Sequence, residues 1–336
     1  MGVELEFTGD QEELRSSVRA VLARECPISL VREVVEKGTT PDGLWARMVE
    51  LDWPALTISE AHGGIGLGFV ELTVVLEELG HVVAPGPLTA TAALFAPAVR
   101  ECGSDEQAAR FLGGVAAGSI TGTLAFAGEP AVEADSVDEV VVTDGERVVV
   151  VPRDQLQVKP IEAFDKSRRL GRVEVHGDVE RSRVLERPER LARAVEEATT
   201  ALAVETVGTC QTIFDTALEY AKQREQFGVP IGSFQAIKHK FADMYVALER
   251  ARATAYFAAV TIAEDDERRT VATSMAKAAV GDAQRLIAQE GIQIMGGIGY
   301  TWEHDMHLYV KRAKSGDALF GTAADHRARI ADHLGV

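Results

Sequence analysis

The stretch Glu219–Tyr245, EYAKQREQFGVPIGSFQAIKHKFADMY, predicts the end of one helix, a tight loop and the start of a second helix. Gly228, Pro230 and Gly232 interrupt the helical pattern, because glycine and proline are the strongest local breakers of regular structure. Beyond them, apolar side chains recur at steps of three and four residues, the spacing of one helix face; they are Ile237, Phe241, Met244 and Leu248. The sequence therefore predicts two helices that meet at a corner.

Arg224 lies at this corner, three residues before Phe227. A guanidinium group in a helix-ending loop is well placed to pair with a phosphate, because its planar fork matches phosphate geometry. An exposed arginine on a helix–helix corner is the simpler interpretation. Taken alone, the residue leaves both interpretations open.

Composition limits the class of protein and its partners. The 336 residues, 46% of them hydrophobic, provide for two or three packed units. The net charge of −17 disfavours a nucleic-acid partner, which would require a basic face. The N-terminus lacks a signal-peptide pattern, and no uncharged run is as long as a membrane span. Because no membrane-spanning run is present, we also expect no membrane partner. The three cysteines share no metal-ligand spacing, so we expect free thiols in a reducing cytoplasm.

The order of predicted elements indicates an α+β fold with separate helical and strand regions. Residues 1–119 are expected to form an N-terminal helical domain, residues 120–187 a small middle β-domain, and residues 188–336 a C-terminal helical bundle. A helical–strand–helical order argues for segregated layers, in contrast to alternating βα units. The glycine run Gly63–Gly68 follows no β-branched strand, so a loop is expected there in preference to a dinucleotide fingerprint.

Individual elements can be placed within these domains. Apolar β-branched runs flank Asp144-Gly145, which predicts a hairpin. Further short strands are expected at Leu170–Val175 and Val179–Leu185. The C-terminal region predicts a four-helix bundle, since long apolar faces are separated by short breaks; its helices are expected at Leu191–Gln223, Ser233–Ala263, Arg268–Gln289 and Ala323–His333.

Three segments together resemble the acyl-CoA dehydrogenase family. An R-x-x-F-G motif leads into Q-A-I-x-H over Arg224–His239, and a Q-x-x-G-G motif lies in Gln293–Tyr300. The third match lies near the N-terminus, at Leu51–Pro54 and at Glu60–Gly68, running into Leu76–Gly80. The segments follow the family's order and span nearly the whole chain. The resemblance implies the family's fold, with an N-terminal helical domain, a small β-domain and a C-terminal four-helix bundle.

The resemblance also implies a chemistry and a cofactor. Family members bind FAD between subunits and oxidise an acyl-CoA to the 2,3-enoyl-CoA; a carboxylate removes the α-proton while a hydride leaves the β-carbon for the flavin. The flavin supplies the redox chemistry and the protein supplies position and electrostatics. Positions that match the family's contacts to the adenine–diphosphate half of a neighbouring subunit's FAD are Arg224, Phe227, Gln235, Gln293, Gly296 and Gly297.

The flavin-ring half departs from the family pattern. The family carries a T-E-P-x-x-G-S-D loop against the ring, and the nearest match is Ala127–Asp135. Gly128 replaces the threonine whose hydroxyl would contact the ring, and the Gly-Ser pair is missing. The middle β-domain is also shorter than the family's.

The family's catalytic base is missing as well. Its glutamate belongs to a Y-E-G-T-S-Q run, where this chain has Phe320, and phenylalanine cannot accept a proton. Thr322 of the same run is retained as a flavin contact, whereas Ala324 replaces a glutamine. Some family members carry the base on the first C-terminal helix; that position falls on Ala198, beside Glu197. A step of one residue turns a side chain by about 100° around a helix, so the catalytic residue stays unassigned.

His304 and His307 lie three residues apart, which could suggest a metal site. Related sequences carry the same kind of segment without a metal, so we expect none.

These observations give one main hypothesis and two alternatives. The chain resembles the short subunits of actinobacterial α2β2 acyl-CoA dehydrogenases that act on steroid side-chain CoA thioesters, and would lend FAD contacts to a catalytic partner chain. It could instead be an active homo-oligomer that uses a displaced base such as Glu197. The third possibility is a non-catalytic module that binds acyl-CoA or protein.

Overall fold

The computed structural model describes residues 7–336, which divide into two compact units. The C-terminal unit comprises the described residues up to Ala23, Leu76–Ala84 and Leu202–Val336. The β-containing unit comprises Arg24–Val75 and Pro85–Ala201. This division follows compactness and does not coincide with the predicted domain boundaries near residues 119 and 187, which stay predictions.

The β-containing unit begins with helices, as expected. These helices are α2 (Ile28–Lys37), α3 (Asp42–Glu50), the first part of α4 (Phe69–His81), α5 (Leu88–Ala90), α6 (Ala96–Cys102) and α7 (Asp105–Ala116). Helix α7 starts at a capping box: Ser104 and Gln107 exchange side-chain and backbone hydrogen bonds, which satisfies two free N–H groups. The Gly63–Gly68 segment follows no strand and belongs to a loop, which confirms the prediction against a dinucleotide fingerprint.

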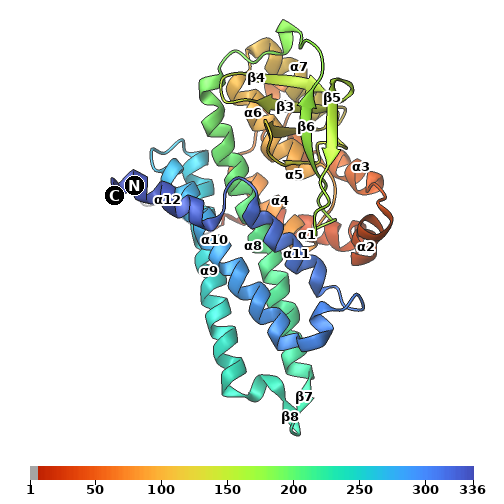
Figure 1. Ribbon diagram of the computed structural model, residues 1–336, viewed down its shortest axis with the longest axis vertical. Coiled ribbons are helices and arrows are strands. Elements are labelled where there is room, and N and C mark those ends of the chain that lie inside the picture. Colours follow the sequence, from red (N-terminus) through yellow and green to blue (C-terminus); the bar gives the residue numbers. More distant parts are fainter. Residues whose placement is uncertain (1–6) are drawn as a thin grey trace. The chain divides into compact units, whose positions relative to one another are not determined.

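Two three-stranded sheets follow (Figure 1). The first has the order β1-β3-β4, with β1 (Gly122–Phe126) parallel to β3 (Glu139–Thr143) and β3 antiparallel to β4 (Val148–Pro152). The second has the order β2-β6-β5, all antiparallel; its strands are β2 Ala131–Val132, β6 Leu170–Val175 and β5 Leu156–Pro160. Small apolar side chains from both sheets, mostly valine and alanine, form one shared core.

The β-hairpin around Asp144-Gly145 and the strand Leu170–Val175 are confirmed. The strand predicted at Val179–Leu185 is wrong: the segment makes a short 3₁₀ turn and a single bridge between Val149 and Val184. The amide of Gln107 donates to the carbonyl oxygens of Ser182 (3.0 Å) and Val184 (2.8 Å). The Gln107 side chain thus satisfies the carbonyl groups of this segment, which in a strand would accept hydrogen bonds from a neighbouring strand.

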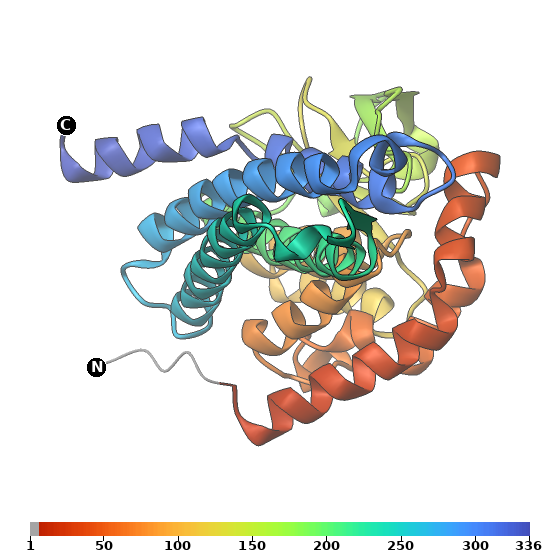
Figure 2. The same cartoon turned by 90° about the horizontal axis from the view of Figure 1, so that it is seen from below.

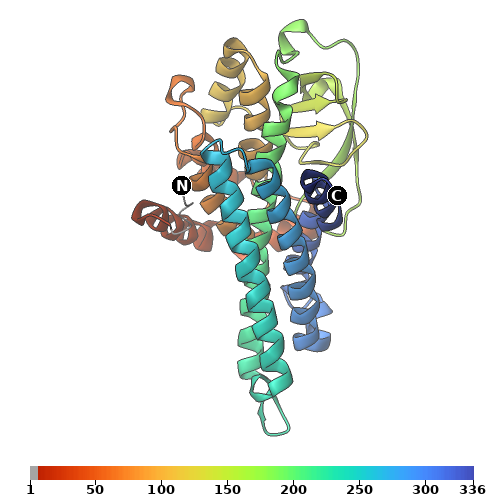
Figure 3. The same ribbon diagram turned by 90° about the vertical axis from the view of Figure 1, so that its left-hand side faces the viewer.

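The C-terminal unit is helical. It contains α1 (Gly9–Glu25), the end of α4, most of α8 (Leu191–Gln223), α9 (Gln235–Ala263), α10 (Arg269–Met295), α11 (Met306–Ala318) and α12 (Ala323–Leu334). Helices α9 and α10 lie side by side (Figures 2 and 3). The four predicted helices are present, three of them within two residues of their expected ends; α10 extends six residues beyond the predicted end at Gln289, and α11 was not predicted. Its charged residues hide the pattern: Arg312 is buried and donates to Glu205 at 2.7 Å.

Helices α4 and α8 cross at a pair of glycines. A Cβ atom on Gly80 would lie 2.0 Å from the carbonyl oxygen of Glu205, and a Cβ on Gly208 would lie 2.0 Å from that of Glu77. The hydroxyl of Thr209 donates to the Gly80 carbonyl at 3.1 Å. The two backbones therefore touch directly, and only glycine leaves room for this approach.

Across residues 7–336, the structure has no helix that combines the length and the apolar character needed to cross a membrane. Cys26, Cys102 and Cys210 are free and buried.

Candidate functional site

The predicted corner is a tight hairpin between two long helices. The N–H of Arg224 donates to the carbonyl of Tyr220 (2.8 Å), which completes the last turn of α8. Two-residue strands then pair antiparallel, β7 (Glu225–Gln226) with β8 (Val229–Pro230). The Arg224 carbonyl accepts from the N–H of Ile231 (2.8 Å), so the arginine backbone is held on both sides. The hairpin lies at one end of α8 and α9 (Figure 1).

The hairpin turn places a large aromatic ring in a strained position. Phe227 and Gly228 have φ values of 56° and 77°, the combination of a two-residue type I′ turn. Glycine adopts this conformation freely, whereas a residue with a side chain loses roughly 1–2 kcal/mol. The Phe227 side chain is 93% exposed, and its ring contacts that of Phe234 edge-on at 6.2 Å. Strain of this kind collects at functional sites, so the ring is a candidate contact for a ligand or a partner.

The Arg224 side chain is exposed, and within the part of the chain that the structure describes it has no carboxylate partner. The structure therefore leaves its guanidinium free to pair with an anionic ligand.

The second predicted segment lies at the same end of the C-terminal unit. The ammonium group of Lys240 on α9 contacts the carboxylate of Glu290 on α10, which fixes the antiparallel register of the two helices. By that register the start of α9, at Gln235, lies beside the end of α10, at Met295. Helix α10 ends there, so Gln293 in its last turn and Gly296 and Gly297 just after it lie at the same end; all three are exposed.

The two glycines present bare backbone. Gly296 has φ 66° and ψ −144°, a region that is essentially restricted to glycine. No atom lies within 4 Å of a Cβ built on Gly296 or Gly297. The N–H of Gly296 also caps α10 by donating to Ile292, so a structural role accounts for part of this geometry.

Thr322 lies elsewhere. Its hydroxyl donates to the Asp325 carboxylate (2.7 Å) and caps α12. Helix α12 packs on α10 at Gly281, where an added Cβ would lie 2.7 Å from that of Ala323. Gly281 is 15 residues before Gly296, or about 22 Å along the helix axis. The structure thus gives Thr322 a capping role and does not bring it to the corner.

The predicted position of the catalytic base, Phe320, is held by backbone contacts. Phe320 has φ 59°, and its carbonyl lies 3.0 Å from Nε2 of His326. Just before it, the buried ammonium group of Lys277 donates to the carbonyls of Gly316 (2.6 Å) and Asp317 (2.9 Å). The segment is therefore well fixed and carries a phenyl ring where proton transfer would require a carboxylate.

Glu197 is engaged in an ion pair. Its side chain is buried, and its carboxylate contacts the guanidinium of Arg100, which lies 3.5 Å from Glu101 as well. To act as a base, Glu197 would have to give up this partner in a buried site, which is costly. The ion pair gives no support to Glu197 as a displaced base.

Both candidate metal ligands have other contacts. Nδ1 of His304 accepts from the N–H of Met306 (3.0 Å), and the His307 ring packs on Trp302 at 4.5 Å. Among the described residues, no three His, Cys, Asp or Glu side chains are grouped to hold a metal ion.

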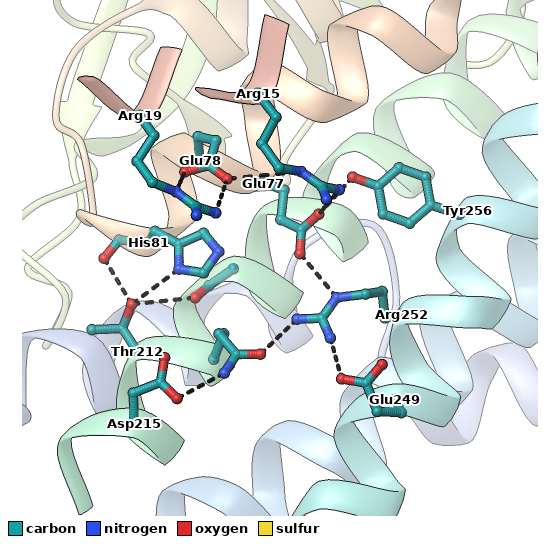
Figure 4. Close-up of polar contacts among 12 residues, drawn as sticks. Arg15, Arg19, Glu77, Glu78, His81, Thr212, Asp215, Glu249, Arg252 and Tyr256 are labelled. Atoms are coloured by element: carbon teal, nitrogen blue, oxygen red, sulfur yellow. Dashed lines mark hydrogen bonds and ion pairs between the residues drawn. The ribbon is translucent and has the colours of Figure 1, made fainter. Parts of the chain in front are cut away.

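A buried ionic network was missed by the sequence analysis (Figure 4). Glu77 on α4 accepts from Tyr256 (2.6 Å) and Arg252 (3.1 Å) on α9, and Glu78 accepts from Arg19 (2.7 Å) on α1. Burial alone would raise the pKa of Glu77, but the nearby positive charge and the tyrosine hydroxyl hold it below its usual value. Two adjacent acids within the apolar run Val74–Leu79 were the available signal, because buried acids require partners.

The chain matches two family models. Residues 8–119 match "Acyl-CoA dehydrogenase, N-terminal domain", and residues 191–335 match "Acyl-CoA dehydrogenase, C-terminal domain". Among curated relatives, acyl-CoA dehydrogenase IpdE2 of Mycolicibacterium smegmatis is 33% identical over 324 residues, covering 96% of this chain and 97% of the relative. IpdE2 of Mycobacterium tuberculosis is 34% identical over 328 residues, covering 96% of each.

Solved structures share the fold over almost the full length. The ChsE4–ChsE5 complex from Mycobacterium tuberculosis superimposes with a TM-score of 0.91 at 23% identity, covering 99% of both chains. A variant of the Tcur3481–Tcur3483 steroid ACAD gives a TM-score of 0.87 at 26% identity, covering 97% of this chain and 98% of that one.

Proposed function

The chain belongs to the acyl-CoA dehydrogenase family, and on that premise we propose that it is one subunit of a heteromeric enzyme and helps to bind the nucleotide half of the cofactor. Members of the family are FAD-dependent oxidoreductases that act on the CH–CH bond of an acyl-CoA. In this proposal the chain contributes contacts to the adenine–diphosphate half of an FAD whose ring is seated on a partner chain. The partner also supplies the base that removes the α-proton.

The observation that carries the proposal is an exposed nucleotide corner on a chain that lacks a carboxylate at the base position. The corner consists of Arg224, Phe227, Gln235, Gln293, Gly296 and Gly297 at one end of α8–α10. A chain that used its own flavin would need the base, yet Phe320 fills that position.

The residues present fit one half of the cofactor. The free guanidinium of Arg224 suits the diphosphate, Phe227 offers a ring face for the adenine, and the bare backbone at Gly296–Gly297 permits close approach. The flavin-ring half fits poorly: Gly128, at φ 82°, has no hydroxyl to offer, and Asp135 of the same loop is bound to Arg169 (2.7 Å).

Bound FAD would accept the hydride from the β-carbon. This chain's own part is to hold the nucleotide end, because a diphosphate paired with a guanidinium and with backbone N–H groups fixes the cofactor's position. The substrate is an acyl-CoA; we infer a steroid-derived acyl group, since a related structure is described as a steroid ACAD.

The test is co-expression with a full-length acyl-CoA dehydrogenase chain from the same genome. We expect this chain alone to be colourless, and the purified complex to contain both chains, to show flavin absorbance and to desaturate acyl-CoA. Stoichiometric FAD and turnover by the isolated chain would refute the proposal. A complex that stays colourless would favour the non-catalytic binding module instead.

A further inference from the structure

The β-containing unit contains a cavity of about 140 Å³ that the proposed function does not use. It lies between the α2–α3 connection, the Pro85–Pro87 turn and the segments at residues 133–136 and 167–169. An engineered protein cavity of roughly 150 Å³ binds benzene, so this volume suits one six-membered ring. Part of the wall is apolar and would pack against carbon; the side chains concerned are Val34, Pro41, Trp45, Pro85 and Pro87.

The wall also includes polar residues, among them a buried carboxyl group. Glu133 is 4% exposed; its Oε2 accepts from the Ser136 hydroxyl (2.7 Å) and its Oε1 from the Arg169 N–H (3.0 Å). Each oxygen has a second lone pair. Burial raises the pKa of Glu133, which favours a protonated form able to donate a hydrogen bond as well. The other polar residues that line the cavity are Thr39, Thr40, Asp42, Thr121, Ser167 and Arg169; the Thr121 and Ser167 hydroxyls donate to Asp138 and Asp165.

The backbone conformation at Glu133 is strained for a residue with a side chain. Glu133 has φ 55°, in the left-handed region where glycine would be unstrained. The Arg169 side chain makes its hydrogen bonds to Asp135 instead, at 2.7–3.1 Å, so from Arg169 Glu133 receives only the backbone N–H. A strained, buried carboxyl group that lines a cavity indicates a binding role, since packing alone would favour a smaller apolar residue.

We propose that this cavity binds a ring-sized, uncharged molecule or ligand segment that bears a hydroxyl or keto oxygen. The oxygen bonds to the Glu133 carboxyl group, and the carbon ring packs against Trp45 and the prolines. The ligand is either a free alcohol or ketone, or the acyl end of a CoA thioester, which has the same chemistry.

The first experiment uses cyclohexanol and methylcyclohexane as probes of the full-length protein by ligand-detected NMR. We expect cyclohexanol to bind with a low-millimolar Kd, and methylcyclohexane at least about fivefold more weakly, because it has no hydrogen bond to offer. Equal binding of the two probes, or none, would overturn the proposal.

Two variants test the residues. Glu133→Gly matches the left-handed backbone, so it should fold at least as well as the wild type and yet bind cyclohexanol about fivefold more weakly. Val34→Phe should fill the cavity from α2 and abolish binding. Glu129→Gln, an exposed glutamate in the same loop, is the matched control and should bind normally. Wild-type affinity in both Glu133→Gly and Val34→Phe would contradict the assignment.

A second arm separates the two sources of ligand. Binding of 4-hydroxycyclohexanecarbonyl-CoA is compared with that of cyclohexanecarbonyl-CoA. A preference for the hydroxylated thioester that Glu133→Gly removes identifies the acyl end as the ligand. Cyclohexanol binding without that preference identifies a free ligand. Neither result depends on FAD, so the proposed function can fail while this site stands.

Discussion

Phe227 combines two unfavourable features, a left-handed backbone and a side chain that is 93% exposed. The turn geometry alone does not favour phenylalanine here, since asparagine or glycine would fit the turn with less strain. A ligand or partner that covered the ring would remove this apolar surface from water, as the proposed function expects.

The Phe227→Asn substitution separates these two effects. We expect the free energy of unfolding of the isolated chain to stay equal or rise by up to about 1 kcal/mol, because asparagine tolerates the left-handed region. Flavin retention by the assembled complex should fall about tenfold. Chemical denaturation and flavin absorbance after gel filtration measure the two quantities. Phe164→Asn, at an exposed aromatic in the other unit, should leave flavin retention unchanged.

His326 makes the stability of the C-terminal unit depend on pH. Burial lowers the pKa of His326 to about 4 from an ordinary 6.5; Arg329 and Lys277 also lower it, while the Phe320 carbonyl and Asp325 oppose them. The unfolded chain therefore binds a proton more readily, and stability is lost as the pH falls from about 6.5 to about 4. We expect a loss of about 1–2 kcal/mol between pH 7 and pH 4.5 by urea denaturation.

His326→Gln should remove most of that difference between the two pH values, although it lowers stability at pH 7. The exposed His333→Gln is the control. An unchanged pH dependence in His326→Gln would show that other groups cause it.

At the crossing of α4 and α8, the close approach of the two backbones leaves no room for a side chain in place of glycine. Gly208→Ala would place a Cβ atom 2.0 Å from a backbone oxygen, and neither helix can yield without separating from the other. We expect a loss of about 3 kcal/mol or more, or failure to fold, seen as a lower Tm. Gly43 on α3 has no atom within 4 Å of a built Cβ, so Gly43→Ala should gain up to about 1 kcal/mol. Equal effects at both glycines would contradict the close approach.

The ionic network joins helices α1, α4 and α9, so its loss should destabilise the packing of all three. Glu77→Gln leaves Arg252 and Arg15 without a full counter-charge in a buried site, which typically costs about 3–5 kcal/mol. Because the folded state lowers the pKa of Glu77, its contribution is present above pH 4.5 and disappears as the pH falls further. Glu12→Gln removes an exposed partner of Arg15 and should change stability little. Denaturation of both variants at pH 7 and pH 4 provides the comparison.

Long periodic helices such as α8 and α9 were predictable because one apolar face repeats over many turns. Helix α11 was not, since buried Arg312 reads as an exposed residue until Glu205, distant in the chain, is placed beside it. Strand β1 pairs in parallel with β3, a non-local contact that no turn signals. Arg224 and Gly296 could be named from motifs, whereas the burial of Glu133 depends on its contact with Arg169, which immediately precedes β6 and is distant in the sequence.

At the scale of the whole molecule, the proposal predicts that assembly and cofactor binding can be separated. Arg224→Ala removes one exposed guanidinium and no described internal contact of that side chain, so the complex with its partner should still form. Its flavin content should fall about tenfold, because a charge-assisted pair with the diphosphate is lost. Size-exclusion chromatography reports assembly and the visible spectrum reports flavin. Arg250→Ala, another exposed arginine, should change neither.

The reciprocal contact of Gly80 and Gly208 offers a way to recognise other chains built like this one. Each glycine makes room for a carbonyl on the opposite helix, so neither position can take a larger residue while the helices stay this close. A homologue that keeps small residues at both sites should keep the same crossing. A homologue with a bulky residue at either site must hold these helices farther apart, and a model of it copied from this backbone would be wrong at that point.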